Sequence, residues 1–279
     1  MSSHEWQKRR TLIETLLQLS RPIFDERRLA KDLDIHADEK SGPNDLVTKY
    51  DREVEALIRS ELEKNFPGEY LLGEESAESA KPQAPAGCTA MWVLDPIDGT
   101  TNFYKGYPFF CSTLSFMVLS EGRWTPVVAC TWDPTRDEVF SAARGFGATL
   151  NGERIAVSSN GRYERGLFAS GFASTRGNPD ETQSYQRFID ITRQTLGVRR
   201  DAAAALDLAY VACGRIDGYW EWNLSPWDLS AGALLVEEAG GHVSDLDGNA
   251  PWNPFCGEII ATNRKLHKSL LNGLGSIAR

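Results

Sequence analysis

The stretch from Trp92 to Phe103 reads W-V-L-D-P-I-D-G-T-T-N-F, and the rest of the chain is organised around it. It begins with apolar residues typical of a strand end and then places two carboxylates three residues apart, Asp95 and Asp98, with Pro96 between them. A Gly-Thr-Thr-Asn run follows. If a helix begins in that run, its first backbone N–H groups suit an anion such as phosphate.

Carboxylates that repel phosphate therefore stand beside groups that attract it. Divalent cations resolve this conflict, because hard ions such as Mg²⁺ take carboxylate and phosphate oxygens together. Two carboxylates at the end of an apolar strand are also costly to bury without a cation. The pair Asp95 and Asp98 thus favours metal binding over a purely structural role.

The length of 279 residues allows one large domain or two small ones, and 41% hydrophobic residues are sufficient for a buried core. We expect a single unit over 1–279, with possible sub-domains at 1–145 and 165–279 on either side of a turn-rich link. The net charge of −9 makes a broad basic surface unexpected, so we expect no nucleic-acid partner.

Targeting and redox signals are absent from the sequence. The first residues are polar with no following apolar run, and no stretch of about 18 apolar residues is present, so we expect neither a secretory signal nor a membrane span. Five scattered cysteines without a C-x-x-C pair indicate reduced thiols. Together these features predict a cytoplasmic protein.

Hydrophobic periodicity predicts alternating helices and strands. Helices are expected at 5–29, with a kink or break at Pro22, and at 48–66, 180–196, 202–213, 227–239 and 264–274. Strands are expected at 69–72, 91–95, 110–119, 123–132, 136–142, 166–171, 216–220, 241–244 and 257–261. Glu121 and Gly122 are expected to form a hairpin turn between two of these strands. We expect a loop at 31–47. This order predicts a layered α/β or α+β fold.

Acidic residues stand at the ends of several predicted elements: Glu74, Asp95, Asp98 and Asp228. Simpler interpretations remain open for some of them. Asp228 in the first turn of a helix can stabilise the helix dipole by roughly 0.3–1 kcal/mol. Glu74 beside Glu75 can be a solvated pair, and Asp51 can complete a capping box with Thr48.

The sequence offers no side-chain nucleophile for phosphate chemistry. The four histidines lack ligand spacing, and no phosphate-binding glycine loop or serine or cysteine nucleophile setting is present. Phosphate chemistry here would therefore use metal-activated water.

Three motifs together resemble the inositol monophosphatase family of Mg²⁺-dependent, lithium-sensitive phosphatases. They are G-E-E-S at 73–76, W-V-L-D-P-I-D-G-T-T-N-F at 92–103, and D-G-Y-W-E-W-N-L-S-P-W-D-L-S-A-G at 217–232 with E-A-G-G at 238–241. Their order and spacing match over nearly the whole chain. The resemblance implies an α+β fold layered as an α-β-α-β-α sandwich, and a homodimer.

The resemblance also implies a site with two or three Mg²⁺ ions. Glu74, Asp95 and the carbonyl of Ile97 would hold the first ion. Asp95, Asp98 and Asp228 would hold the second, and Glu74 would also face a weaker third site. The resemblance places Lys40 in an N-terminal loop near that third ion.

Catalytic roles follow from the same resemblance. Thr100 and Asp51 would position the attacking water, with Glu74 beside it, and the backbone N–H groups of Gly99 and Thr100 would bind the phosphate. The water would attack phosphorus in line, and the second metal would stabilise the leaving alkoxide.

Substrate contacts are implied at Glu221, at Asp98 and at the backbone near Ala204. The sequence departs from the family here, because Ala202 and Ala203 replace the usual glycine and small hydroxyl residue. The added methyl and the lost hydroxyl bear on the substrate more than on the phosphatase reaction.

The expected activity is a Mg²⁺-dependent phosphomonoesterase acting on a small polyol or sugar phosphate, with inositol 1-phosphate favoured. Histidinol phosphate, fructose 1,6-bisphosphate or a nucleotide 3′-phosphate are alternatives within the family. An alternative of a different class is a regulatory binding protein that retains the site.

Overall fold

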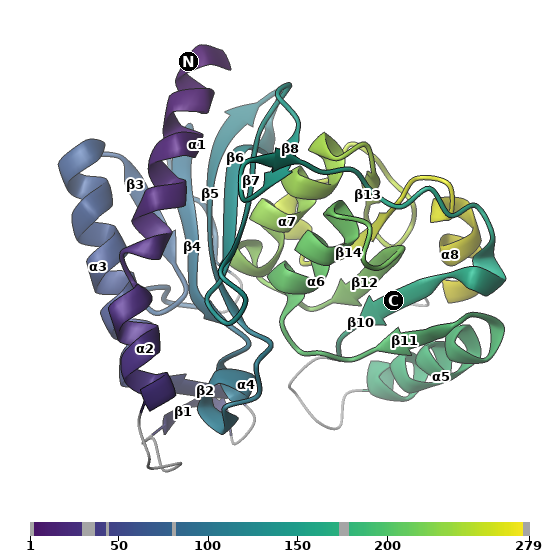
Figure 1. Ribbon diagram of the computed structural model, residues 1–279. Coiled ribbons are helices and arrows are strands. Elements are labelled where there is room, and N and C mark those ends of the chain that lie inside the picture. Colours follow the sequence, from purple (N-terminus) through teal and green to yellow (C-terminus); the bar gives the residue numbers. More distant parts are fainter. Residues whose placement is uncertain (1–2, 30–36, 43–44, 80–81, 173–178, 276–279) are drawn as a thin grey trace.

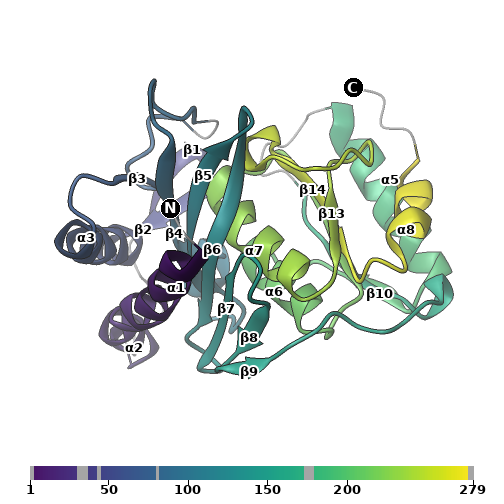
Figure 2. The ribbon, with the colours of Figure 1, turned by 90° about the horizontal axis from the view of Figure 1, so that it is seen from above.

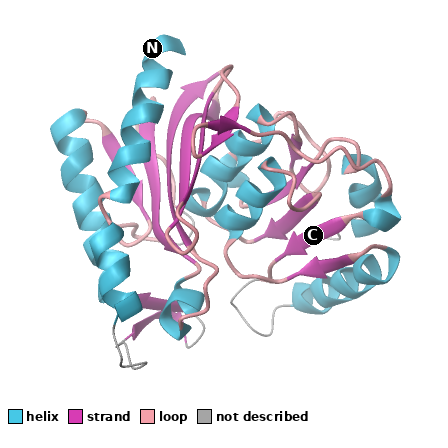
Figure 3. Ribbon diagram, viewed as in Figure 1, coloured by secondary structure: helices cyan, strands magenta, loops and turns pink. Residues whose placement is uncertain are grey.

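Helices and sheets alternate as α-β-α-β-α layers in the computed structural model, which describes residues 3–29, 37–42, 45–79, 82–172 and 179–275 (Figures 1 and 3). The layered arrangement predicted from the sequence is confirmed. Seen from above, the two sheets stand on either side of a central pair of helices (Figure 2).

The larger sheet has seven strands in the order β3-β4-β5-β6-β7-β8-β9. Strand β3 is parallel to β4, and the following neighbours are antiparallel. The strands are β3 (Tyr70–Gly73), β4 (Ala90–Asp98), β5 (Cys111–Ser120), β6 (Arg123–Asp133), β7 (Glu138–Ala143), β8 (Ala148–Leu150) and β9 (Glu153–Arg154). The predicted turn between β5 and β6 is confirmed, because Glu121 (φ 52°) and Gly122 (φ 75°) both adopt the left-handed conformation that a tight hairpin needs.

The smaller sheet has five strands in the order β11-β10-β12-β14-β13. Its strands are β10 (Leu167–Ser170), β11 (Gly197–Arg199), β12 (Gly218–Trp222), β13 (His242–Ser244) and β14 (Glu258–Thr262). Strands β10, β11 and β12 run parallel, whereas β14 is antiparallel to both β12 and β13.

Three groups of helices enclose these sheets (Figure 1). The outer face of the larger sheet is covered by α1 (Ser3–Gln18), α2 (Arg21–Leu29) and α3 (Lys49–Asn65). The central layer is α6 (Ala204–Ala212) and α7 (Pro226–Glu238), and the far face of the smaller sheet carries α5 (Pro179–Gln194) and α8 (His267–Leu274). The short helix α4 (Thr100–Lys105) follows β4, and single turns of 3₁₀ helix occur at Tyr163–Arg165 and Pro254–Cys256.

Local sequence explains several helix boundaries. The expected break at Pro22 is confirmed, because α1 ends at Gln18 and α2 begins at Arg21. Thr48 and Asp51 form the predicted capping box of α3, in which the Asp51 carboxylate accepts a hydrogen bond from the backbone N–H of Thr48.

The predicted loop at 31–47 was wrong, and strand β11 was not predicted. The region 31–47 contains the hairpin of β1 (Ala37–Gly42) and β2 (Asp45–Thr48), and β11 lies between α5 and α6. Both segments are short and lack a clear apolar alternation. Pairing with a neighbouring strand, rather than their own composition, makes them strands.

One hydrophobic core crosses the central layer. It joins Phe140 of β7 and Ala129 of β6 in the larger sheet to Tyr219 and Ala261 in the smaller sheet, through the apolar residues of α6 and α7. Within the described residues, no helix combines the length and apolar character needed to cross a membrane.

Because this core is shared, we expect the two sheets to unfold together, as a single unit. Calorimetry of the metal-free protein should show one transition whose calorimetric and van't Hoff enthalpies agree. Two separated transitions would mean that each half folds on its own.

Candidate functional site

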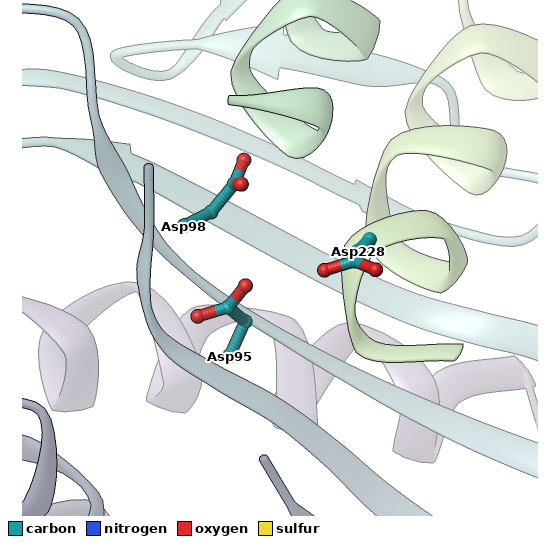
Figure 4. Close-up of side chains that lie close together, drawn as sticks. All are labelled: Asp95, Asp98 and Asp228. Atoms are coloured by element: carbon teal, nitrogen blue, oxygen red, sulfur yellow. The ribbon is translucent and has the colours of Figure 1, made fainter. Parts of the chain in front are cut away.

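Strand β4 carries two aspartates on the same side because its regular pairing is interrupted. Asp95 pairs with Thr113 of β5 and Asp98 pairs with Cys111, so three steps along β4 match two steps along β5. Residues three apart in a regular strand point to opposite faces. The bulge between the two pairs brings both carboxylates to the side of the strand that faces the central helices (Figure 4).

The first turn of α7 brings a third carboxylate to this pair. Ser225 is the N-cap of α7, Pro226 follows it, and the backbone N–H of Ser225 donates to Oδ2 of Asp228 at 2.7 Å. Asp95, Asp98 and Asp228 each offer one oxygen, and these oxygens lie within 4.8 Å of one another (Figure 4). The fold thus brings together residues that are 130 positions apart in the chain.

Glu74 lies next to this cluster. It follows β3, whose last residue, Gly73, pairs with Leu94 of β4, and its backbone N–H donates to the Leu94 carbonyl at 3.1 Å. Its half-buried carboxylate raises the pKa of Asp95 both by charge and by a hydrogen bond. Glu74 is therefore placed beside the three aspartates, as expected for a residue that shares a metal with Asp95.

Burial dominates the electrostatics of the cluster. It raises the pKa of Asp95 well above its usual value, and Glu74, Asp98 and Asp228 raise it further. Burial also raises the pKa of Asp98 to about 7 and that of Asp228 well above its usual value. These carboxylates disfavour their common ionised state unless a cation offsets their charge.

The cluster fits a hard divalent cation. Oδ1 of Asp95 is buried and has no hydrogen-bond partner in the described part of the chain. A buried carboxylate oxygen without a donor is costly, and a metal ion removes that cost. The donors are all carboxylate oxygens, which suit Mg²⁺ better than softer metals.

A hydroxyl–carboxylate pair lies next to the aspartate cluster, at the start of α4. The Thr100 hydroxyl lies 3.2 Å from Oδ1 of Asp51 and 3.0 Å from the carbonyl oxygen of Ile97. Oδ2 of Asp51 accepts hydrogen bonds from the backbone and the hydroxyl of Thr48, at 2.8 and 2.6 Å. Asp51 is thus held firmly, with one oxygen left for Thr100.

A helix does begin in the Gly-Thr-Thr-Asn run: it is α4, with Gly99 at its N-cap. Gly99 has φ 88°, and no side chain caps the helix. An ideal Cβ at Gly99 would lie 3.1 Å from Cβ of Ala203 and 3.1 Å from the Phe109 carbonyl oxygen. Glycine is therefore required here by both conformation and space.

Helix α6 begins against Asp98. Its N-cap, Ala203, has no side chain that can cap, and Oδ2 of Asp98 accepts a hydrogen bond from the backbone N–H of Ala205 at 2.7 Å. Ala204 is the first residue of α6 and is buried. Ala202 has φ 62°, a conformation that glycine adopts more easily.

Glu221 faces the central layer from β12 and is buried. Burial raises its pKa to about 7, whereas a hydrogen bond from Tyr219 and the charge of Arg200 lower it. Asp98 raises the pKa of Glu221, which shows that the two carboxylates act on one another across the site. Lys40 belongs to β1, but its side chain lies outside what the structure describes.

Sequence reasoning missed four residues that contact site residues: Cys111, Gly171, Ala205 and Tyr219. The Cys111 thiol donates to Oδ2 of Asp98 at 3.7 Å. Only Tyr219 carried a usable signal, because residues two apart in a strand share a face. The other contacts depend on pairing and packing between distant segments.

Comparisons with known proteins point to one family. Residues 8–277 match the profile of the inositol monophosphatase family. A Pseudomonas aeruginosa protein named Nus factor SuhB is 42% identical over 240 residues, which cover 86% of this chain and 86% of that protein. A Synechocystis protein named inositol-1-monophosphatase is 40% identical over 238 residues, which cover 85% of this chain and 79% of that protein.

Solved structures share the fold as well. The inositol monophosphatase from Anabaena (Nostoc) superposes with a TM-score of 0.83 at 35% identity, covering 98% of this chain and 97% of that one.

Metal binding at the aspartate cluster should be measurable as stability. Mg²⁺ at 100 times its dissociation constant stabilises a folded protein by about 2.7 kcal/mol, so the wild-type melting temperature should rise on addition of Mg²⁺. Asp95→Asn should abolish this rise and the Mg²⁺-dependent release of phosphate, while the protein remains folded.

Asp247→Asn is the matched control, because Asp247 is exposed in the turn between β13 and β14 and undergoes the same chemical change. It should respond to Mg²⁺ as the wild type does. Full turnover by Asp95→Asn would contradict the assignment of Asp95 as a metal ligand.

Proposed function

Since this chain belongs to the inositol monophosphatase family and is a phosphomonoesterase, we propose that it hydrolyses a small polyol phosphate in the cytoplasm, with inositol 1-phosphate the favoured substrate. The observation that supports this best is the gathering of Asp95, Asp98 and Asp228 beside the pair of Thr100 and Asp51. Metal ligands and a water-orienting hydroxyl then lie in one site.

The metal ligands divide into overlapping sets. Glu74, Asp95 and the Ile97 carbonyl would hold one Mg²⁺, and Asp95, Asp98 and Asp228 a second. Glu74 and Lys40 would border a weaker third position. When bound, Mg²⁺ supplies positive charge that offsets the phosphate and activates water as the nucleophile.

The protein's own groups orient the reactants. The Thr100 hydroxyl donates its proton in a hydrogen bond to Asp51. The lone pairs of the Thr100 oxygen can then accept a hydrogen bond from the attacking water. As the water loses its proton to the Thr100 hydroxyl, the Thr100 proton would pass to Oδ1 of the buried Asp51 carboxylate, which becomes neutral. The backbone N–H groups of Gly99 and Thr100, at the start of α4, bind phosphate oxygens.

The leaving group binds on the side of the smaller sheet. The Glu221 carboxylate accepts hydrogen bonds from neighbouring hydroxyls of the polyol ring, and Asp98 and the backbone at Ala204 face the same ring. Histidinol phosphate, fructose 1,6-bisphosphate and nucleotide 3′-phosphates are the alternative substrates, because Ala202 and Ala203 alter the wall beside this ring.

One assay tests the substrate assignment. Phosphate release would be measured with Mg²⁺, with and without Li⁺, on inositol 1-phosphate, histidinol phosphate, fructose 1,6-bisphosphate and adenosine 3′,5′-bisphosphate. We expect the highest kcat/KM on inositol 1-phosphate, and inhibition by Li⁺. A higher value on another of these esters would reassign the substrate.

Glu221→Ala should separate substrate recognition from phosphate chemistry. Loss of a charged hydrogen-bond acceptor costs about 1.5–3 kcal/mol, so kcat/KM for inositol 1-phosphate should fall about 10–100-fold. The loss on p-nitrophenyl phosphate should be much smaller. Equal losses on both esters would mean that Glu221 does not bind the leaving group.

We further propose a homodimer that forms through the outer edge of the smaller sheet. β11 is the edge strand, and α5 packs beside it (Figure 1). The neighbouring apolar side chains are exposed, with Leu196 at 62%, Tyr185 at 45% and Ile189 at 42%. Exposed apolar groups beside an open strand edge favour association.

Leu196→Asp should weaken the dimer, because it places a charge in the apolar contact. Sedimentation velocity of the wild type and the variant would measure this. Leu119→Asp is a matched control, since Leu119 is also exposed but lies on β5. Dissociation by both variants, or by neither, would contradict this interface.

A binding role is the second candidate function, favoured by the name Nus factor that relatives at 42% and 40% identity carry. The inactive variant Asp95→Asn separates the two roles. If it restored the growth of a strain that lacks the gene as fully as the wild type does, binding rather than catalysis would be the main function.

A further inference from the structure

Strand β12 carries both Glu221 and a tyrosine that forms a hydrogen bond with it. Tyr219 and Glu221 are two residues apart, so their side chains lie on the same side of the strand, toward the central helices. The Tyr219 hydroxyl donates a hydrogen bond to Oε2 of Glu221. Tyr219 is fully buried, between Ala169 of β10 and Ala261 of β14, so its ring has little freedom to move.

Gly171, the residue after β10, leaves the space that the Glu221 carboxylate occupies. An ideal Cβ at Gly171 would lie 2.0 Å from Oε2 and 2.2 Å from Oε1 of Glu221. Real Cβ atoms do not approach other atoms so closely, so with any other residue at this position the Glu221 carboxylate would have to move. Gly171 has no positive φ, so a side chain here would disturb the space around Glu221 and not the backbone conformation.

Several charged groups surround this carboxylate. Burial raises the pKa of Glu221 and Asp98 on β4 raises it further, whereas Tyr219 on β12 and Arg200 before α6 lower it. Glu221 in turn raises the pKa of Asp207 on α6 and of Asp228 on α7. Burial, with Glu221 and Asp207, raises the pKa of the Tyr219 phenol well above its usual value, so the phenol keeps its proton for donation.

We propose that Tyr219 and Gly171 are positioning residues: Tyr219 holds Oε2 of Glu221 by a hydrogen bond, and Gly171 leaves the space in which the carboxylate lies when it binds the hydroxyls of the leaving group. This proposal rests on the proposed function, in which Glu221 reads a polyol. A carboxylate held in one orientation loses less conformational freedom when substrate binds. Selectivity for hydroxylated leaving groups then depends on residues that do not touch the substrate.

Removal of the Tyr219 hydroxyl tests the first support. Tyr219→Phe should raise KM for inositol 1-phosphate about tenfold, as expected for a hydrogen bond to a charged group, with kcat changed less than about twofold. The loss on p-nitrophenyl phosphate should be several times smaller. Tyr163→Phe is the matched control, because the buried Tyr163 hydroxyl has no partner among the described residues.

The pH profile provides a readout that a structural defect would not change. The Tyr219 hydrogen bond lowers the pKa of Glu221, so its removal raises that pKa. Glu221 must be ionised to accept two hydroxyls. The acid limb of kcat/KM for inositol 1-phosphate should therefore move to higher pH in Tyr219→Phe and stay unchanged in Tyr163→Phe.

Gly171→Ala tests the second support and decides the proposal if Tyr219→Phe fails to fold. The new methyl must displace the Glu221 carboxylate, so this variant should lose more on inositol 1-phosphate than on p-nitrophenyl phosphate. Gly161→Ala is its control, because a Cβ there would meet only Lys265 Cδ, at 3.8 Å. All variants would be compared by melting temperature.

Glu221→Ala in the same assay distinguishes failure of the positioning role from failure of the proposed function. If Glu221→Ala is selective for the polyol ester but Tyr219→Phe and Gly171→Ala are not, the positioning role is wrong and the proposed function stands. If Glu221→Ala itself affects both esters equally, Glu221 does not bind the leaving group, and the positioning role is wrong as well.

Discussion

Mutual repulsion among buried carboxylates is the constraint on which the rest of the structure depends. The oxygens of Asp95, Asp98 and Asp228 lie within 4.8 Å of one another in a largely buried site, and Glu74 adds a further negative charge beside them. In a medium of low dielectric such charges are tolerated only with a cation. Backbone N–H groups oppose their separation at two positions, since Ala205 donates to Asp98 and Ser225 donates to Asp228.

The central helices connect this cluster to the substrate side. α7 brings Asp228 in its first turn, and α6 donates a backbone N–H to Asp98 where its N-cap, Ala203, has no hydroxyl. The turn before α6 is strained, because an alanine at φ 62° costs roughly 1–2 kcal/mol. The Asn102 side chain donates to the Asp201 carbonyl at 2.6 Å and holds this turn against α4.

Much of the fold could be predicted from local patterns. The capping box of α3, the break before α2 and the turn between β5 and β6 were all confirmed, since each depends on residues adjacent in sequence. The β1–β2 hairpin and β11 were not predicted, because their strand conformation comes from a neighbouring strand. The bulge in β4 left no local signal except Pro96, yet it decides that Asp95 and Asp98 point the same way.

The sequence by itself determined the class of chemistry, because Asp95 and Asp98 follow an apolar strand and the motifs at 73–76, 92–103 and 217–232 together resemble one family. Only the tertiary structure decided how they meet. Convergence of Asp228 with β4 and the space that Gly171 leaves for Glu221 depend on contacts between segments far apart in the chain. Such contacts follow from packing, which no local pattern encodes.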